Sequence, residues 1–162
     1  MRPWRAQLVV AAGASLLGAC GFHLQGHKAL PEQLRVSYVQ ATDRQSDFVQ
    51  DLRKEMLTSG ARLTTSREEA TAVVRILADN YQRRVLSVSI TDQPAEYEIT
   101  YTVRFAVDFG GKEVLPAQEV SAVRDYTFDE TILLAKNNEE AILREALAHD
   151  LADVVMRRLA NL

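Results

Sequence analysis

The sequence predicts an α+β fold, a two-layer sandwich in which two helices cover one face of a four-stranded mixed sheet. Three observations lead to this prediction. Apolar and polar residues alternate over 96–109, which is the pattern of a half-buried strand. Gly110-Gly111 then provides a tight turn into a partner strand. Apolar residues also recur at helical spacing over 48–57 and 143–159. The predicted order of elements is therefore β-α-β-β-β-α.

The first half of the chain predicts a strand, a helix and a second strand. Alternation over 34–39 predicts the first strand. The helix that follows has Asp47 as its predicted N-cap and Gly60 as its C-terminal stop. The second strand begins at 72–78 and resumes over 85–90, with a bulge or bend predicted between them, where polar residues interrupt the pattern.

The long third strand and its partner form a predicted hairpin. The two-residue glycine turn pairs Phe109 with Lys112, and the same register pairs Tyr101 with Val120. This arrangement sets apolar side chains against one another on one face. The opposite face is polar, so one side of the sheet is expected to meet water or a partner.

A long helix is predicted at the end of the chain. Asn137, followed three residues later by Glu140, resembles a capping box, so the helix is expected to begin there. It ends near Leu159, with Arg157 and Arg158 in the last turn, where the helix dipole favours cations.

The N-terminus has the pattern of a bacterial lipoprotein signal. Arg2 and Arg5 precede an apolar run that is too short to span a bilayer, for which about 20 residues are needed. Leu17-Gly18-Ala19-Cys20 has the lipobox pattern. We therefore expect a cleaved signal over 1–19 and a covalent lipid on Cys20. The alternative is an ordinary signal peptide with a chance cysteine.

The mature chain is expected to consist of a lipidated tether over 20–31 and a single domain over 32–162. In lipoproteins of the enteric type, Asp after the lipidated cysteine favours retention in the inner membrane. Gly21 occupies that position, which predicts sorting to the outer membrane.

Composition and motifs argue against several classes of function. Removing residues 1–19 takes away two arginines and no acid, so the net charge changes from −3 to −5. A nucleic-acid binder would normally carry a basic stripe instead. With its single cysteine acylated, the chain would have no thiol for a disulfide. His23 and His27 lack further ligands nearby, so no metal or other cofactor is expected. The sequence has no nucleophile elbow, phosphate loop or dinucleotide fingerprint, and we predict that it is not an enzyme.

Three segments occur in the order of one known family. The mature chain opens with Cys-Gly-Phe-His-Leu-Gln-Gly over 20–26, and Ala95-Glu96-Tyr97 opens the long strand. Arg124, followed by aromatic residues and then by Leu-Ala-Lys-Asn-Asn-Glu over 134–139, leads into the last helix. Together these segments resemble LptE, the family of lipopolysaccharide-assembly lipoproteins of Gram-negative outer membranes. The resemblance covers nearly the whole mature chain.

The resemblance implies a role in binding and assembly. Members insert as a plug into the LptD β-barrel in a one-to-one complex, assist assembly of that barrel, and bind lipopolysaccharide during its transport to the cell surface. The protein would be anchored by lipid on the periplasmic side of the outer membrane, with its domain inside the barrel lumen. The alternative from another class is a periplasmic auxiliary lipoprotein of a lipid-transport ATPase system.

The resemblance also implies binding residues. Lys136 matches a basic residue that the family uses toward lipopolysaccharide, and a cation suits the phosphates of lipid A. The alternative for Lys136 is an ordinary exposed loop lysine. Some members carry an arginine in the hairpin before the Ala-Glu-Tyr strand, but residues 90–94 here contain no cation.

Three arginines are the nearest candidates to replace that missing cation: Arg83, Arg84 and Arg124. Arg124 is expected at the end of the sheet that carries this hairpin. An equal alternative for Arg124 is a local ion pair with Glu96 or Glu98.

Overall fold

The computed structural model describes residues 30–127 and 133–162, without the side chains of 133–138. The predicted signal, Cys20 and most of the predicted tether lie outside the described residues.

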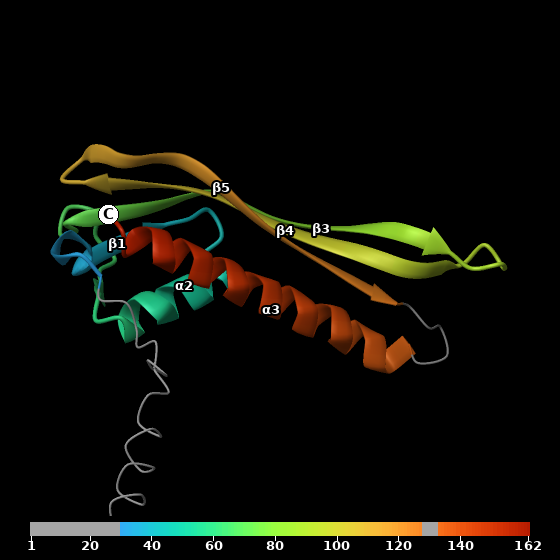
Figure 1. Ribbon diagram of the computed structural model, residues 1–162. Helices are drawn as coiled ribbons and strands as arrows, with labels where there is room; N and C mark the ends of the chain where they lie inside the picture. The colour runs from blue at the N-terminus through green and yellow to red at the C-terminus, as the bar shows by residue number, and fades with distance from the viewer. Residues whose placement is uncertain (1–29, 128–132) are drawn as a thin grey trace, which may run out of the picture.

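The described residues form one mixed sheet with two helices on one of its faces (Figure 1), which confirms the predicted α+β class. The strand order is β2-β1-β3-β4-β5, so the sheet has five strands where four were predicted. The additional strand, β2, has only two residues and pairs in parallel with β1. The elements are β1 (Val36–Gln40), α2 (Asp47–Thr58), β2 (Arg62–Leu63), β3 (Ala72–Val88), β4 (Pro94–Phe109), β5 (Lys112–Thr127) and α3 (Leu133–Leu159).

The first strand and helix differ slightly from the prediction at their N-terminal ends. Leu34 belongs to a short 3-10 helix, and β1 begins two residues later. Ser46, not Asp47, caps α2, because its hydroxyl accepts a hydrogen bond from the backbone N–H of Val49. Gly60 ends the helix as predicted, with a φ of 89° that suits glycine.

The predicted interruption of the second strand over 80–84 is wrong. β3 runs without a break from Ala72 to Val88, and residues 80–84 pair regularly with β4. The register with β4 shifts at Leu77, at Leu86 and again between Ser87 and Val88. Side chains in this stretch alternate between the polar outer face and the helix-covered face, where Tyr81 and Arg83 bond to Glu140 of α3, so they do not break the strand.

The turn at Gly110-Gly111 pairs Phe109 with Lys112 as predicted, but the register changes farther along the hairpin. Tyr101 faces Ala122 and not Val120. Two additional residues are accommodated on β5 between Glu113 and Gln118, close to Pro116, which has no N–H for the ladder. A slip of two residues preserves the face of every side chain, so the predicted apolar and polar faces are still correct.

The last helix begins before the predicted capping box. α3 starts at Leu133, so Asn137 lies within the helix and is not its N-cap. Its C-terminal end agrees with the prediction, with Arg157 and Arg158 in the last turn.

The core lies between the two helices and the sheet. Each fully buried large apolar side chain contributes roughly 1.5–3 kcal/mol to stability. Residues that are almost completely buried there are Phe48, Leu52 and Met56 of α2, Ile99, Val103 and Phe105 of β4, and Leu147, Leu151 and Leu159 of α3.

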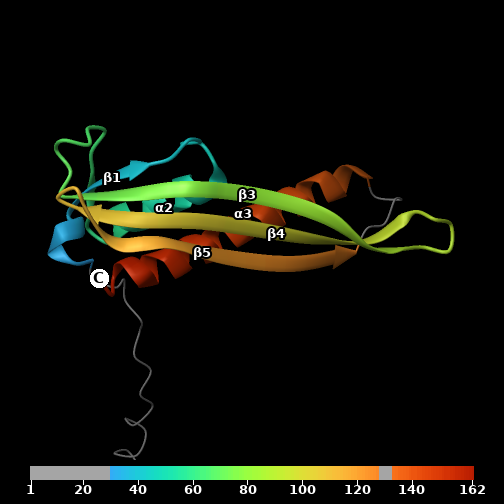
Figure 2. The ribbon, with the colours of Figure 1, turned by 90° about the horizontal axis from the view of Figure 1, so that it is seen from above.

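The molecule is elongated (Figures 1 and 2). β1 pairs with β3 only as far as Arg75, so beyond that point the sheet consists of β3, β4 and β5 alone. We call this three-stranded part the distal end, and the part that contains β1 and the glycine turn the proximal end. β4 has 16 residues, which corresponds to a length of about 50 Å. The C-terminus and the short 3-10 helix Glu32–Leu34, blue in Figure 1, lie at the proximal end.

Candidate functional site

A cluster of tyrosines, one arginine and one glutamate joins the distal end to α3. Glu140 of α3 accepts hydrogen bonds from the hydroxyls of Tyr81 on β3, at 2.8 Å, and Tyr126 on β5, at 3.0 Å. Arg83 of β3 donates to the same carboxylate at 2.6 Å. A single acidic side chain therefore connects both outer strands of the distal end to the helix. We call these residues, together with Tyr97, the tyrosine cluster.

Ring contacts complete the tyrosine cluster. The rings of Tyr97 and Tyr126 stack with centroids 5.6 Å apart, and the guanidinium of Arg83 lies 4.8 Å from the centroid of Tyr97. Such a cation–π contact contributes about 0.5–1 kcal/mol when partly exposed. Residues 97, 99 and 101 of β4 all face the helices. The ring of Tyr97 and the ring of its cross-strand neighbour Tyr126 therefore point toward α3.

The cluster shifts the pKa values of its members. Burial alone would raise the pKa of Glu140, but the hydrogen bonds from Tyr81, Arg83 and Tyr126 lower it below the usual value. Burial and the bond to Glu140 raise the pKa of the Tyr81 phenol. Glu140 is therefore a carboxylate, and Tyr81 and Tyr126 are neutral phenols, at neutral pH, which are the charge states that their hydrogen bonds require.

The three arginines named from the sequence lie in one band of the distal end. Arg83 and Arg124 are both cross-strand neighbours of Ile99, so they share the face covered by the helices. Arg84 is the neighbour of Glu98 on the opposite, open face. Arg124 thus lies at the end of the sheet that was expected.

Each of these arginines has a carboxylate partner. Arg83 pairs with Glu140, and Arg84 makes two hydrogen bonds to Glu98, at 2.5 and 2.9 Å. Arg124 pairs with Asp150 of α3 at 3.2 Å, and not with Glu96 or Glu98 as the alternative proposed. The side chains of all three are substantially exposed, with 46% exposure for Arg83, 57% for Arg124 and 70% for Arg84. An incoming anion can reach them, but it would compete with these carboxylates.

Position 136 lies in the first turns of α3, so the predicted loop is helical there. It is one turn before Glu140, the residue that fixes this part of the helix to the sheet. The side chain of Lys136 lies outside the described part of the structure.

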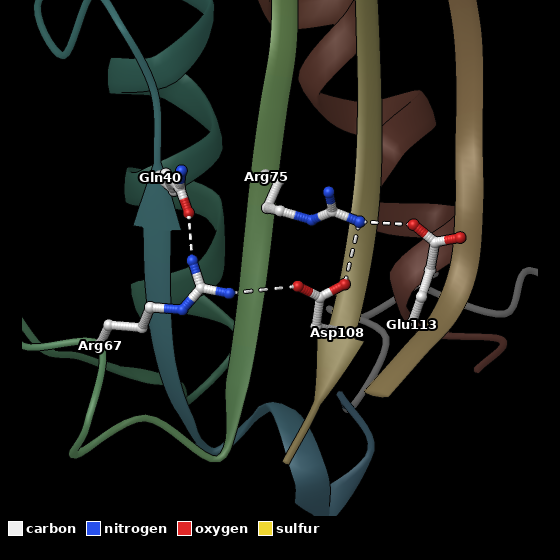
Figure 3. Close-up of polar contacts among 5 residues, drawn as sticks. All are labelled: Gln40, Arg67, Arg75, Asp108 and Glu113. Atoms are coloured by element: carbon white, nitrogen blue, oxygen red, sulfur yellow. Dashed lines mark hydrogen bonds and ion pairs between the residues drawn. The ribbon is translucent and has the colours of Figure 1, made fainter. Parts of the chain in front are cut away.

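A second polar network lies on the open face at the proximal end (Figure 3). Asp108 of β4, only 8% exposed, is 3.0 Å from Arg75 and 3.6 Å from Arg67. Arg75 also pairs with Glu113, and Arg67 donates to Gln40. Two cations and two anions balance here, so we interpret this network as a structural clamp. It holds the segment between β2 and β3 against the sheet.

Most of the rest of the open face is polar, as predicted, although Val73 and Val123 also lie on it. Thr102 and Ser121 form a hydrogen bond of 3.1 Å across β4 and β5. Among the described residues, no group of His, Cys, Asp or Glu has the arrangement of a metal site. Within the same residues, no helix has the length and apolar character needed to cross a membrane.

Comparison with known proteins identifies the family. The family model named LptE, with the description "Lipopolysaccharide-assembly", matches residues 34–159, which is almost the entire described domain. The chain belongs to the LptE family. The resemblance to the LptE family that the sequence predicted is therefore confirmed, and with it the assignment to the lipopolysaccharide-assembly lipoproteins.

Individual LptE relatives and solved structures agree with this assignment. The LPS-assembly lipoprotein LptE of Pectobacterium atrosepticum is 24% identical over 157 residues, which cover 96% of this chain and 84% of the relative. The crystal structure of rare lipoprotein B from Shewanella oneidensis is 26% identical, with a TM-score of 0.67 over 78% of this chain and 94% of that one. The solution structure of lipoprotein B from Nitrosomonas europaea is 25% identical, with a TM-score of 0.71 over 86% and 90% of the two chains.

Sequence reasoning about this LptE-family chain missed the central role of Glu140. It was treated as part of a capping box, whereas its carboxylate is the shared acceptor of the tyrosine cluster. The tyrosines at positions 97 and 101 were placed correctly on the core face of β4. No local signal connects Tyr81, Arg83 and Tyr126 with Glu140, because those contacts depend on how α3 packs across the sheet.

Proposed function

We propose that this protein is the lipid-anchored plug of an LptD-type outer-membrane β-barrel. It assists assembly of the barrel, forms a one-to-one complex with it, and binds lipopolysaccharide on its way to the cell surface. It acts by binding, without catalysis or a cofactor other than the lipid on Cys20. The observation that carries this proposal is the LptE family match over residues 34–159.

The shape and surface of the domain support the plug. An elongated sandwich about 50 Å long has a polar open face, and the interior of a wide barrel is polar as well. An apolar open face would instead remove water from the polar groups of the barrel interior without offering them hydrogen bonds, which is unfavourable. The lipid on Cys20 would hold the domain beside the barrel and raise its local concentration there.

The first experiment is affinity purification of the tagged, acylated protein from detergent-solubilised outer membranes, with mass spectrometry of the proteins retained. We expect a stoichiometric barrel of LptD type. A Cys20→Ser variant, which cannot receive the lipid, is the control for the anchor and should leave the outer-membrane fraction. Recovery of an inner-membrane ATPase complex instead would contradict the plug and favour the auxiliary lipoprotein.

For lipopolysaccharide, we propose Lys136 together with Arg83, Arg84 and Arg124. Position 136 lies in the first turns of α3, the helix that Glu140 fixes to the distal end, and the three arginines lie in the same part of the molecule. Lys136→Asp is expected to weaken binding of purified lipopolysaccharide. Lys112→Asp, an exposed change at the proximal glycine turn, is the matched control. Equal affinity of the two variants would remove Lys136 from the site.

A further inference from the structure

The edge of the sheet at β3 is left unpaired where β1 ends (Figure 2). β1 pairs in parallel with β3 only from Ala72 to Arg75, whereas β3 continues to Val88. Among the described residues, no strand lies beside β3 beyond Arg75 on that side. The backbone N–H and C=O groups of every second residue point toward the same side of a strand, so this edge can pair with an incoming strand.

Two hollows flank the unpaired edge, directly beyond the end of β1. One lies between residues 41–43 of the β1–α2 loop and residues 76–80 of β3. The other lies on the helix-covered face, between the N-terminus of α2, β3 and α3. Asp43 and Asp79 line both hollows, so we treat the two as one feature and call it the edge slot. Leu77 contributes an apolar wall and is 40% exposed.

The edge slot has an excess of negative charge. Asp43, Asp47 and Asp79 line it together with one cation, Arg144, which bonds to Asp47 at 2.7 Å. The other two carboxylates are held by neutral donors: Asp79 accepts from the hydroxyl of Ser46, and Asp43 from a backbone N–H at 2.8 Å. These hydrogen bonds orient the carboxylates without neutralising them. The N-terminus of α2 offsets only about half an elementary charge.

A neighbouring cation is directed away from the edge slot. Arg44 donates to the hydroxyl of Tyr38 at 2.8 Å, and its guanidinium lies 5.9 Å from the centroid of that ring. Tyr38 is the cross-strand neighbour of Val73, on the open face of the proximal end. The edge slot therefore keeps its negative charge, which is complementary to a basic side chain.

We propose that the edge slot binds an extended segment of a partner protein, which adds to β3 as a further strand and directs a lysine or arginine toward Asp43 and Asp79. This inference goes beyond the proposed function, because it assigns a protein ligand to residues that are not assigned to lipopolysaccharide.

The two parts of the edge slot have separate roles in this mode of binding. Main-chain hydrogen bonds along a strand edge supply affinity, and hollows for alternate side chains supply specificity. A second copy of this chain that paired through the same edge would bring like charges together, which is unfavourable. A small cation could meet the carboxylates but would leave the strand edge unpaired.

Binding of designed hexapeptides tests the inference. The probe is fluorescein-labelled Thr-Val-Arg-Val-Thr-Val with an amidated C-terminus, and a second peptide has glutamate in place of the arginine. Two further arginine peptides are N-methylated on alternate backbone nitrogens, one on each set. The protein is the mature chain, 20–162, with Cys20→Ser so that no detergent is required. Fluorescence anisotropy gives the affinities, and hydrogen exchange locates the contact.

We expect the arginine peptide to bind and to slow amide exchange in residues 77–83. The glutamate peptide should bind at least about tenfold more weakly, because it meets like charges. The two methylated peptides should differ by about tenfold, because only one set of N–H groups faces β3 in an added strand.

Two protein variants test the charge of the edge slot. Asp43→Asn keeps an acceptor for the local backbone N–H and should weaken binding of the arginine peptide about fivefold. Asp92→Asn, at an exposed aspartate of the β3–β4 hairpin, is the matched control and should leave the affinity unchanged.

Other outcomes would overturn the inference and leave the proposed function intact, since no lipid or barrel enters the assay. Equal affinities of the two methylated peptides would refute strand addition. Equal affinities of the arginine and glutamate peptides would refute recognition of a basic side chain. Failure of all four peptides to bind at millimolar concentration would refute both. Tighter peptide binding by Lys28→Glu would indicate that the chain's own tether occupies the edge slot, and affinity that falls as the protein concentration rises would indicate a second copy.

Discussion

Replacing Glu140 tests whether the tyrosine cluster holds α3 to the distal end of the sheet. Its carboxylate accepts from Tyr81 at 2.8 Å, from Tyr126 at 3.0 Å and from Arg83 at 2.6 Å. Glu140→Ala removes the shared acceptor and leaves both phenols without it. Tyr126 is only 8% exposed, so water replaces the lost bond poorly there.

The expected cost follows from these contacts. A hydrogen bond to a charged group contributes roughly 1.5–3 kcal/mol. Because Glu140 is 26% exposed, we use the lower limit for the two phenols, which gives about 3 kcal/mol together. The half-exposed pair with Arg83 adds at most about 0.5 kcal/mol. For a chain of this length, a loss of about 3 kcal/mol lowers the Tm by roughly 6–12 °C.

Urea unfolding of the mature chain at pH 7, followed by circular dichroism, measures this free energy. Glu139→Ala is the matched control, since Glu139 is exposed and adjacent in the same helix, and should change stability by less than about 0.5 kcal/mol. The double variant Tyr81→Phe/Glu140→Ala should lose less free energy of unfolding than the sum of the losses of the two single variants, because both changes remove the same hydrogen bond. A Glu140→Ala variant as stable as Glu139→Ala would refute the role given to the cluster.

Three further predictions concern stability. Hydrogen bonds lower the pKa of Glu140, so its contribution is present above its ordinary pKa of 4.5 and is lost as the pH falls through the lower folded value. Stability measured from pH 7 to pH 3 should therefore fall more steeply for the wild type than for Glu140→Gln, and parallel curves would contradict this. Asp108→Asn should lower the free energy of unfolding, measured with urea, by about 2–3 kcal/mol, because it removes the buried carboxylate that pairs with Arg75. The exposed change Glu119→Gln on the same face should cost almost nothing, and equal losses would count against the clamp. Ser46→Ala should cost about 1 kcal/mol through the lost N-cap of α2, which thermal unfolding would detect.

Much of the fold could be predicted because its signals are local. Alternation over β4 identified the strand and its core face, and Gly60 and the glycine turn were placed correctly where the backbone has positive φ. The register of the β4–β5 hairpin was wrong by two residues, since the additional residues near Pro116 are accommodated by bulges that a strict two-residue turn does not foresee. The two-residue strand β2 was missed because so short a segment has no detectable period.

The candidate site was only partly predictable. The arginines at 83, 84 and 124 were named from the sequence and do lie in one band of the distal end. Their partners were not foreseen. Arg124 bonds to Asp150 and Arg83 to Glu140, both on a helix that is distant in sequence. Such pairs depend on the angle at which α3 crosses the sheet, and no local pattern encodes that angle.

By itself, the sequence determined the class of fold, the faces of the long strands, the lipoprotein signal pattern and the family, because each of these is written in residues close together along the chain. The tertiary structure alone decided that Glu140 joins three elements, that Asp108 is buried between two arginines, and that Ile90 in the hairpin between β3 and β4 is left uncovered. Those features arise where distant segments meet or fail to meet, and their energies depend on burial and geometry that exist only once the chain has folded.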